Sequence, residues 1–223
     1  ELPKAEAFFR EKGLPFRWQE GDGVKGDSLL TVDPMGFPVE YFFEMAHVAS
    51  ELREFHHHRG GAPMRLDHFN LQVPDVEEAY RWYREALGFR LSEYTETDDR
   101  PPRLWAAWLF RKPNVHDVAL MQGPKTRLHH VGFWVPEPSR ILAACDILAA
   151  AGHHHAIERG PGRHGISNAF FLYLRDPDGH RIEFYTGDYS TLDPDLPPRG
   201  WKLHDPRRQT YWGAPAPQSW FEE

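Results

Sequence analysis

The pattern of hydrophobic and polar residues occurs twice along the chain, at a fixed offset of 62 residues. The segment MRLDHFNLQVPDVEEAYRWYREALGFR begins at Met64, and it aligns without a gap with TRLHHVGFWVPEPSRILAACDILAAAG, which begins at Thr126. Self-similarity at a fixed spacing indicates a duplicated structural unit. We therefore expect two copies of one module.

Each copy opens with a run of residues typical of a β-strand, Leu66–Val73 in the first copy and Leu128–Val135 in the second. Each run is followed by a proline, Pro74 or Pro136. Proline fixes φ and has no backbone N–H to donate, so the strand is expected to end there.

A helix and further strands are predicted after each proline, with Gly88 and Gly152 as the C-terminal stops of the two helices. The apolar residues at helical spacing are Ala79, Trp82, Tyr83, Ala86 and Leu87 in the first copy and Ile141, Leu142, Cys145 and Leu148 in the second. The extended runs that follow are Leu104–Arg111, Val115–Gln122, Asn168–Arg175 and His180–Thr186. Each copy thus predicts one strand, one helix and about three more strands, which is an α+β fold of tandem βαβββ modules.

A partial third copy lies upstream. Its helix is expected at Lys4–Lys12, and VDPMGFPVEYFFE from Val32 matches RDPDGHRIEFYTG from Arg175, so that Glu40 and Glu183 share one register. The chain thus begins inside a module whose first strand is missing, and it has no initiator Met. We interpret it as a longer protein trimmed at its front.

These patterns divide the chain into three parts. Residues 1–63 form a partial N-terminal module plus a polar linker, which occupies 51–63. Residues 64–190 form the catalytic domain, made of modules 64–125 and 126–190. The Pro- and Trp-rich tail, 191–223, is expected to cover the active site.

Composition narrows the function classes. The net charge of −7 gives no reason to expect nucleic acid as a partner, and no run approaches the length of about 18 apolar residues that a spanning helix needs, so no membrane partner is expected either. The single cysteine, Cys145, cannot form a disulfide within the chain, which favours a soluble cytoplasmic protein. The 14 histidines and the 14% aromatic residues direct attention to a metal and an aromatic ligand.

His68 and His130 occupy the same strand position in the two copies. If the modules pack about a pseudo-twofold axis, the two imidazoles converge. Glu183, on the last strand of the second copy, is the predicted third ligand, since alternate strand residues share a face. Two imidazoles and one carboxylate leave open positions on a divalent ion, an arrangement associated with non-haem Fe(II) oxygen chemistry.

Other candidate ligands have simpler interpretations. His129 should point to the opposite face from His130 and be structural, because strand side chains alternate. Glu40 has no paired strand histidine and is interpreted as a surface or inter-strand carboxylate. The runs His56–His58 and His153–His155 lie in predicted loops, where solvation or adventitious metal binding is expected.

Several segments of the chain resemble those of a known family. The segments that carry the resemblance are LDHFN, VHDVAL, RLHHVGF, IERGPGRHGISNAFFLYLRDPDGHRIEFYTGDY and WKLHDPRRQTYWG. They resemble the type I extradiol ring-cleaving dioxygenases of the vicinal oxygen chelate superfamily, and among these the enzymes that cleave 3,4-dihydroxyphenylacetate. The resemblance covers nearly all of the chain from Arg65 onward. It implies four modules per subunit with the metal in the carboxy-terminal pair, so that this chain lacks the first module and the opening strand of the second.

The resemblance also implies site residues. The same three ligands are implied, with Asn70 and Trp108 near the bound ligands, His116 as the acid–base residue, His164 and Tyr173 beside the substrate oxygens, and Arg159 and Arg208 at the substrate carboxylate. From the residues alone, His116 could equally be a hydrogen-bonded strand histidine, Tyr173 a core aromatic and Arg159 a solvated loop cation. In the tail, Gln209 stands where a second carboxylate-binding arginine is expected; either Arg207 or Arg208 compensates, or the catechol carries a different side chain.

The function implied is insertion of O2 into a catechol ring next to its two hydroxyls, giving a ring-opened muconic semialdehyde in aromatic catabolism. The implied cofactor is Fe(II), with Mn(II) as the alternative, and the implied assembly is a homotetramer. The competing functions are an extradiol dioxygenase for another catechol, a glyoxalase-like metal isomerase, and a ligand-binding protein of the same fold without catalysis.

Overall fold

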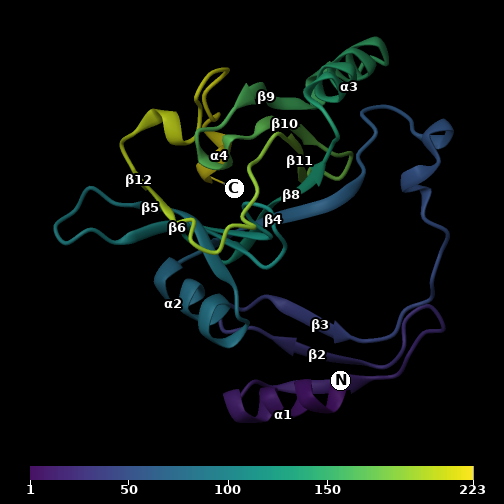
Figure 1. Ribbon diagram of the computed structural model, residues 1–223, viewed down its shortest axis with the longest axis vertical. Coiled ribbons are helices and arrows are strands. Elements are labelled where there is room, and N and C mark those ends of the chain that lie inside the picture. Colours follow the sequence, from purple (N-terminus) through teal and green to yellow (C-terminus); the bar gives the residue numbers. More distant parts are fainter. Residues whose placement is uncertain (223) are drawn as a thin grey trace. The chain divides into compact units, whose positions relative to one another are not determined.

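The computed structural model describes residues 1–222 and divides into two compact units, Glu1–His56 and His57–Glu223. Figure 1 shows the course of the chain within each unit. Each unit has its own sheet, so we describe each separately.

The first unit is a three-stranded antiparallel sheet with one helix. Its elements are α1 (Leu2–Lys12), β1 (Phe16–Gln19), β2 (Ser28–Val32) and β3 (Pro38–Phe42), with the strand order β1-β2-β3. Gly13 ends α1 with a left-handed backbone (φ 67°), a conformation that glycine adopts without steric cost. Phe9 is fully buried and packs against Phe16 and Tyr41, which joins the helix to the sheet.

Glu40 lies on β3 and accepts hydrogen bonds from Lys25 Nζ and Ser28 Oγ, both at 2.6 Å. It is therefore an inter-strand carboxylate, as predicted. Along the chain, two short 3-10 turns follow β3, in the segment predicted to be a linker. They are η1 (Glu51–Arg53) and η2 (Phe55–His57).

The second unit contains one nine-stranded sheet built from two βαβββ modules and a tail. The first module contains β4 (Arg65–Val73), α2 (Val76–Arg81), η3 (Trp82–Ala86), β5 (Arg90–Glu96), β6 (Leu104–Phe110) and β7 (Val118–Gln122). The second contains β8 (Arg127–Trp134), α3 (Pro138–Ala150), η4 (His154–Ala156), β9 (Ile157–Arg163), η5 (Ile166–Asn168), β10 (Phe170–Arg175) and β11 (Arg181–Thr186). The tail adds β12 (Arg199–Lys202), η6 (Pro206–Arg208) and α4 (Ser219–Glu222).

The strand order of the sheet is β12-β5-β6-β7-β4-β8-β11-β10-β9. The two modules therefore lie side by side in one sheet, with their first strands adjacent. The first strands of both modules, β4 and β8, pair antiparallel at the centre of the sheet. Each then pairs in parallel with the last strand of its own module: Asn70 of β4 lies opposite Ala119, and Gly132 of β8 lies opposite Glu183. The two halves of the sheet are thus related by the pseudo-twofold axis that the repeat predicts.

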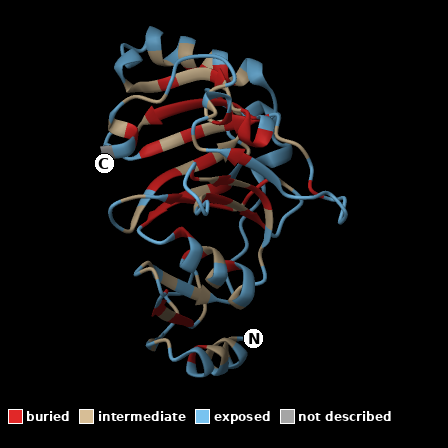
Figure 2. Cartoon of the chain, turned by 90° about the vertical axis from the view of Figure 1, so that its left-hand side faces the viewer, coloured by how far each residue is buried: buried red, intermediate tan, exposed pale blue. Residues whose placement is uncertain are grey.

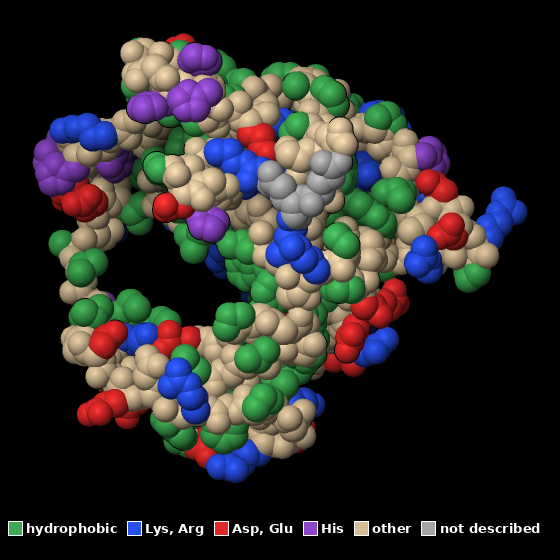
Figure 3. Space-filling model, turned by 180° about the vertical axis from the view of Figure 1, so that it is seen from behind, with side chains coloured by type: hydrophobic (Ala, Val, Ile, Leu, Met, Phe, Trp, Pro, Cys, Tyr) green, Lys and Arg blue, Asp and Glu red, His purple; other side chains and the backbone are tan. Residues whose placement is uncertain are grey.

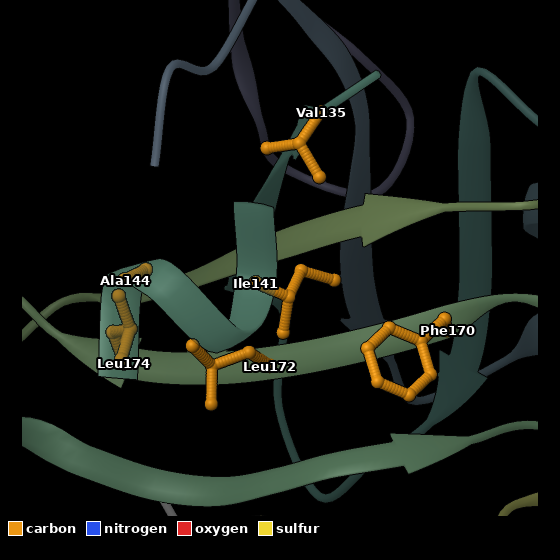
Figure 4. Close-up of a cluster of buried hydrophobic side chains, with 6 residues drawn as sticks. All are labelled: Val135, Ile141, Ala144, Phe170, Leu172 and Leu174. Carbon is orange, nitrogen blue, oxygen red and sulfur yellow. The ribbon is translucent and has the colours of Figure 1, made fainter. Parts of the chain in front are cut away.

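The core lies between the helices and the sheet. In the second module, α3 covers β10, and Ile141 and Ala144 of the helix pack with Leu172 of the strand (Figure 4). Cys145 lies half-buried beside this cluster, in the helix where it was predicted. Buried residues follow the strands of the large sheet in Figure 2.

Two local features differ from the prediction. The helix after Pro74 is α-helical only to Arg81 and then widens into the π-helical turn η3, which the apolar spacing did not indicate. The strand predicted at Val115–Gln122 begins only at Val118, so His116 lies in the loop before β7.

No helix within residues 1–222 is long and apolar enough to cross a lipid bilayer.

Candidate metal centre and substrate pocket

Three buried side chains from three strands meet at the centre of the large sheet. His68 comes from β4, His130 from β8 and Glu183 from β11, and one potential ligand atom of each lies within 4.8 Å of the others. His68 Nε2 is 2.9 Å and His130 Nε2 is 3.3 Å from the same oxygen, Glu183 Oε2. Within residues 1–222 they form the one group of His, Cys, Asp and Glu side chains close enough to share an ion.

The strand register explains why these three meet. Gly132 on β8 is the partner of His68 on β4 and of Glu183 on β11. A Cβ built on Gly132 would overlap the His68 ring. A glycine at this position therefore leaves the space in which the imidazole turns toward Glu183.

Two β-bulges bring further side chains to the histidines. The pairing of β4 with β8 shifts between Leu66 and His68 and again at Leu71, which lies opposite Leu128. The residues at these shifts are Asp67 and His129, and both are buried. The prediction that His129 points away from His130 is therefore wrong: the Nδ1 atoms of the two rings are 2.7 Å apart, because a bulge interrupts the alternation of side chains.

The centre favours a positive charge. Burial opposes ionisation of Glu183, but the neighbouring side chains of His130, His164 and His68 hold its pKa well below the ordinary value. Burial also opposes a charge on His68, yet Asp67 and Glu183 raise its pKa to about 9. In the absence of a metal, the positive charge between His68 Nε2 and Glu183 is a proton on His68. A divalent cation bound to the same two atoms can replace that proton.

The donor set fits such a cation. Both histidines present Nε2 to the centre, and Glu183 Oε1 lies 3.6 Å from His164 Nε2, beyond an ordinary hydrogen bond. Two imidazoles and a carboxylate suit first-row divalent ions such as Fe(II) and Mn(II). A buried carboxylate oxygen without a close donor is the expected state of a ligand atom.

A pocket of about 520 Å³ of empty space, part of it open to solvent, adjoins the three side chains. The residues that line it are Asn70, Trp105, Trp108, His116, Met121, His130, Arg159, His164, Ile166, Ser167, Tyr173, Glu183, Tyr185, Arg208, Gln209 and Trp220. All the second-sphere residues implied by the resemblance are therefore at this pocket.

His116 is buried against the metal centre. Its ring centroid is 4.1 Å from that of His68, and its Nδ1 has no hydrogen-bond partner among the described residues. The alternative of a hydrogen-bonded strand histidine is therefore wrong. Burial, with a further contribution from His68, holds the pKa of His116 well below its ordinary value, so the ring is neutral.

His164 and Tyr173 form a hydrogen-bonded pair in the lining of the same pocket. His164 Nδ1 contacts the carbonyl of Gln209 and therefore carries the proton, which leaves Nε2 to accept from the Tyr173 hydroxyl at 3.0 Å. The ring of His164 stacks on Phe171 at 3.9 Å. Burial, reinforced by Glu183, raises the pKa of Tyr173 well above its ordinary value, so the phenol keeps its proton.

Arg159 is only 3% exposed, so it is not a solvated loop cation. Its Nη2 donates to Thr210 Oγ1 at 2.8 Å and to the Gln209 carbonyl at 3.1 Å. Its guanidinium lies between the rings of Phe171 and Trp220, at 4.7 and 4.8 Å. Arg159 therefore fastens the tail to the pocket wall, in addition to lining the pocket.

Of the two candidate arginines Arg207 and Arg208, Arg208 faces the pocket. It stacks on Trp105 at 4.8 Å, and its Nε donates to the Leu203 carbonyl at 3.0 Å. Arg207 is exposed and pairs with Asp205 at 2.8 Å. Gln209 also lines the pocket, so a neutral amide stands where a second cation was expected.

Trp220 is the main site residue that the sequence did not reveal. It is 4% exposed, its ring edge meets Tyr173 at 4.4 Å, and its backbone carbonyl lies 3.2 Å from His129 Nε2. Its only signal in the sequence is the tryptophan-rich tail. Glu93 was also missed: this fully buried carboxylate accepts from Ser167 N at 2.7 Å and from Trp201 Nε1 at 2.5 Å, and so fixes one pocket wall to the tail.

The two histidine runs are not among the residues that line the pocket. His56, His57 and His153–His155 are exposed, and histidines (purple) are visible on the molecular surface in Figure 3. Their exposure agrees with the predicted solvated loops.

Known proteins share these features. The profile of the Glyoxalase/Bleomycin resistance protein/Dioxygenase superfamily matches residues 65–184. A manganese-dependent 2,3-dihydroxybiphenyl 1,2-dioxygenase of Geobacillus genomosp. 3 is 34% identical over 92% of this chain and 69% of its own length. Homoprotocatechuate 2,3-dioxygenase from Brevibacterium fuscum, in complex with 3,4-dihydroxyphenylacetate, superimposes with a TM-score of 0.91 and 46% identity over 99% of this chain and 69% of the other.

A variant of the B. fuscum enzyme gives the same TM-score, and there this chain spans 61% of the other. The chain thus spans between three fifths and seven tenths of the length of these relatives. It belongs to the Glyoxalase/Bleomycin resistance protein/Dioxygenase superfamily and, within it, to the extradiol ring-cleaving dioxygenases.

Proposed function

We propose that this protein is an extradiol dioxygenase that opens a catechol ring beside its two hydroxyls and releases a muconic semialdehyde. The observation that carries the proposal is the meeting of His68, His130 and Glu183 beside a pocket that His130 and Glu183 line together with several aromatic side chains. When bound, a divalent metal at these residues supplies a common template for catechol and dioxygen and withdraws charge from the catechol oxygens.

The chain's own residues handle the protons. Tyr173 donates its hydroxyl hydrogen to His164 Nε2, so the lone pairs of the phenol oxygen are left to accept a hydrogen bond from a catechol hydroxyl. This contact stabilises a hydroxyl that keeps its proton, so it favours a catechol that has lost one proton over one that has lost both. On the other side, His116 holds a neutral imidazole with an unpartnered Nδ1 in the pocket wall, where it can take up and return one proton during turnover.

Aromatic side chains orient the ring and exclude water. Trp105, Trp108 and Trp220 line the same pocket as the acid–base residues. Flat apolar walls favour a planar substrate, and positioning of both reactants is itself a major source of rate.

The preferred substrate is 3,4-dihydroxyphenylacetate, the ligand of the solved B. fuscum enzyme. Arg208 supports this choice, because its guanidinium faces the pocket and can bind a carboxylate. Gln209 supports the alternative of a catechol with another side chain. Fe(II) is the proposed metal, and the name of the Geobacillus relative makes Mn(II) the alternative.

The test combines metal analysis with oxygen uptake. The protein is loaded with Fe(II) or Mn(II) under argon, and oxygen consumption and the yellow ring-opened product are followed with catechol, 3,4-dihydroxyphenylacetate and 2,3-dihydroxybiphenyl. We expect equal consumption of catechol and oxygen, and loss of both metal and activity in His68→Ala. A metal-loaded protein that consumes no oxygen with any catechol would instead favour the glyoxalase-like isomerase or the non-catalytic binding protein.

Assembly as a homotetramer in the cytoplasm stays a prediction of the family resemblance. Sedimentation of the loaded protein measures the first of these two properties.

A further inference from the structure

The residue before each candidate histidine ligand contacts that histidine. Asp67 and His129 occupy equivalent positions of the two modules and both lie at β-bulges. Asp67 Oδ2 is 3.1 Å from His68 Nδ1, and His129 Nδ1 is 2.7 Å from His130 Nδ1. One carboxylate and one imidazole thus stand at the same place behind the two ligands.

A histidine that binds a metal through Nε2 is neutral and carries its remaining proton on Nδ1. This proton needs an acceptor, which fixes both the ring orientation and the basicity of Nε2. Both histidines of the site present Nε2 to Glu183. Asp67 is therefore the acceptor for one ring, and His129 is the available acceptor for the other.

The role of acceptor fixes the proton on His129. If its Nδ1 accepts from His130, its own hydrogen sits on Nε2, and the Trp220 carbonyl lies 3.2 Å from that atom. Arg181 Nη1 lies 2.8 Å from the same Nε2 and favours the opposite arrangement, in which Nε2 accepts. That arrangement would put hydrogens on His129 Nδ1 and His130 Nε2, and His130 could then not bind a metal.

Metal binding at His130 requires the first arrangement, in which the Trp220 carbonyl accepts the His129 Nε2 hydrogen and Arg181 Nη1 can donate to the His129 carbonyl at 3.4 Å instead. The indole ring lies under the guanidinium groups of Arg159, at 4.8 Å, and Arg181, at 4.5 Å. Its edge also packs against the ring of His129 at 4.6 Å. A buried carbonyl in this place needs a donor, and the His129 Nε2 hydrogen can supply it.

We propose that Asp67 and His129 are positioning residues that keep the Nδ1 hydrogen on each metal-binding histidine, and that His129 extends this control to the C-terminal segment through the Trp220 carbonyl. The inference rests on the proposed function, because it requires a metal at the three ligands. It assigns the tail a part in metal affinity, beyond its part in lining the pocket.

The test measures Mn(II) binding without turnover. Free Mn(II) gives an electron paramagnetic resonance signal that is lost on binding, so titration yields a dissociation constant for each variant. His129→Phe keeps a flat ring and removes both nitrogens, and we expect its dissociation constant to rise roughly 10- to 100-fold. His129→Asn keeps an oxygen near the place of Nδ1 and should recover most of the affinity. His154→Phe, at an exposed position, is the matched control and should bind as the wild type does.

Trp220→Ala tests the second half of the proposal. We expect it to weaken Mn(II) binding, and we expect the double variant with His129→Phe to bind little worse than His129→Phe alone, since both changes act on one path. Independent, multiplicative effects would overturn the link to the tail.

Folding and function can be told apart. Thermal unfolding of the metal-free variants shows whether the fold survives, and a structural role alone would lower the melting temperature without changing the affinity of the folded protein. Wild-type affinity in His129→Phe, or equal losses in His129→Phe and His129→Asn, would overturn the inference. Absence of Mn(II) uptake by the wild type would instead overturn the proposed function, and the inference with it.

Discussion

Gly132 determines the geometry of the site because it has no side chain. It lies opposite both His68 and Glu183, and a methyl group at this position would overlap the imidazole. We expect Gly132→Ala to displace the His68 ring and to lower metal affinity at least as strongly as loss of a residue that orients a ligand, roughly 10- to 100-fold. Metal analysis after dialysis measures this, and full metal content would show that the ring has room to move.

His116 gives the second prediction at this scale. General acid–base catalysis contributes typically about 10²- to 10⁴-fold to a rate, so His116→Phe should slow turnover by an amount in that range. Because His116 is not one of the three ligands, metal content should stay near normal. Oxygen uptake and metal analysis on the same sample separate the two effects, with His180→Phe, an exposed position, as the control. Unchanged turnover would remove the assigned role.

The three candidate ligands could be identified from the sequence because the chain is duplicated. A histidine at the same place in both copies indicates a position in the fold, which a single histidine does not. Two histidines at one register of two copies imply a meeting point, and the register of Glu183 on its strand completes the set. The contact of His129 with His130 could not be predicted, since a bulge adds one residue to a strand without leaving a pattern in the chain.

Neighbouring strands of the second module are linked by one partly buried ion cluster. Glu158 on β9 accepts from Arg181 on β11 at 2.6 Å and from Arg175 on β10 at 2.7 Å. Ser219 of α4 also donates to this carboxylate, at 3.1 Å. The cluster therefore holds three strands and the start of the last helix together.

The pH dependence of stability follows from this cluster. Burial opposes the charge of Glu158, but Arg181 and Arg175 lower its pKa to about 2, from an ordinary value of 4.5. A lowered folded-state pKa stabilises the fold above pH 4.5, and this contribution is lost as the pH falls from 4.5 toward 2. After screening by solvent it amounts to about 2 kcal/mol.

We therefore expect Glu158→Gln to lower the free energy of unfolding at pH 7 and to differ less from the wild type as the pH approaches 2. Urea unfolding of the metal-free proteins across this range measures the difference. A difference that does not vary with pH would show that the ion cluster is not its source.

At the level of elements, alternation and proline punctuation were sufficient to place the strands β4 and β8. The π-helical turn η3 was not predictable, because its residues keep the apolar spacing of an α-helix and differ only in hydrogen bonding. The late start of β7, after His116, has a similar cause: Val115 and His116 have strand-like character, but the chain turns there.

For the whole molecule, the division into two units with separate cores makes a further prediction. The three candidate metal ligands lie entirely within His57–Glu223, whereas Phe9 is the buried centre of the other unit. Phe9→Ala should destabilise its own unit by about 3–5 kcal/mol, the usual cost of this core truncation.

We expect Mn(II) affinity to be unchanged in Phe9→Ala, and thermal unfolding to show an early transition ahead of the main one. Calorimetry of the metal-loaded protein together with the binding titration provides both measurements. A large loss of affinity would show that the two units are coupled energetically.

The tail is the part of the chain whose structure could be predicted least from the sequence. Its composition predicted a segment that covers the active site, and Arg208 and Gln209 do line the pocket. The place of Trp220 depends on ring contacts with Arg159 and Arg181, which lie far from it in the chain. Contacts of this kind leave no regular pattern in the sequence, so they can be recognised only in the folded structure.

The paired registers of β4 with β7 and β8 with β11 have one last consequence. Glu183 lies opposite Gly132, and the corresponding partner of Asn70 in the first module is Ala119. A perfectly symmetric duplicate would carry a second acidic group there and would surround an ion with four protein donors. The methyl group of Ala119 breaks that symmetry and offers no donor, so one more position on a six-coordinate ion is left for an incoming reactant.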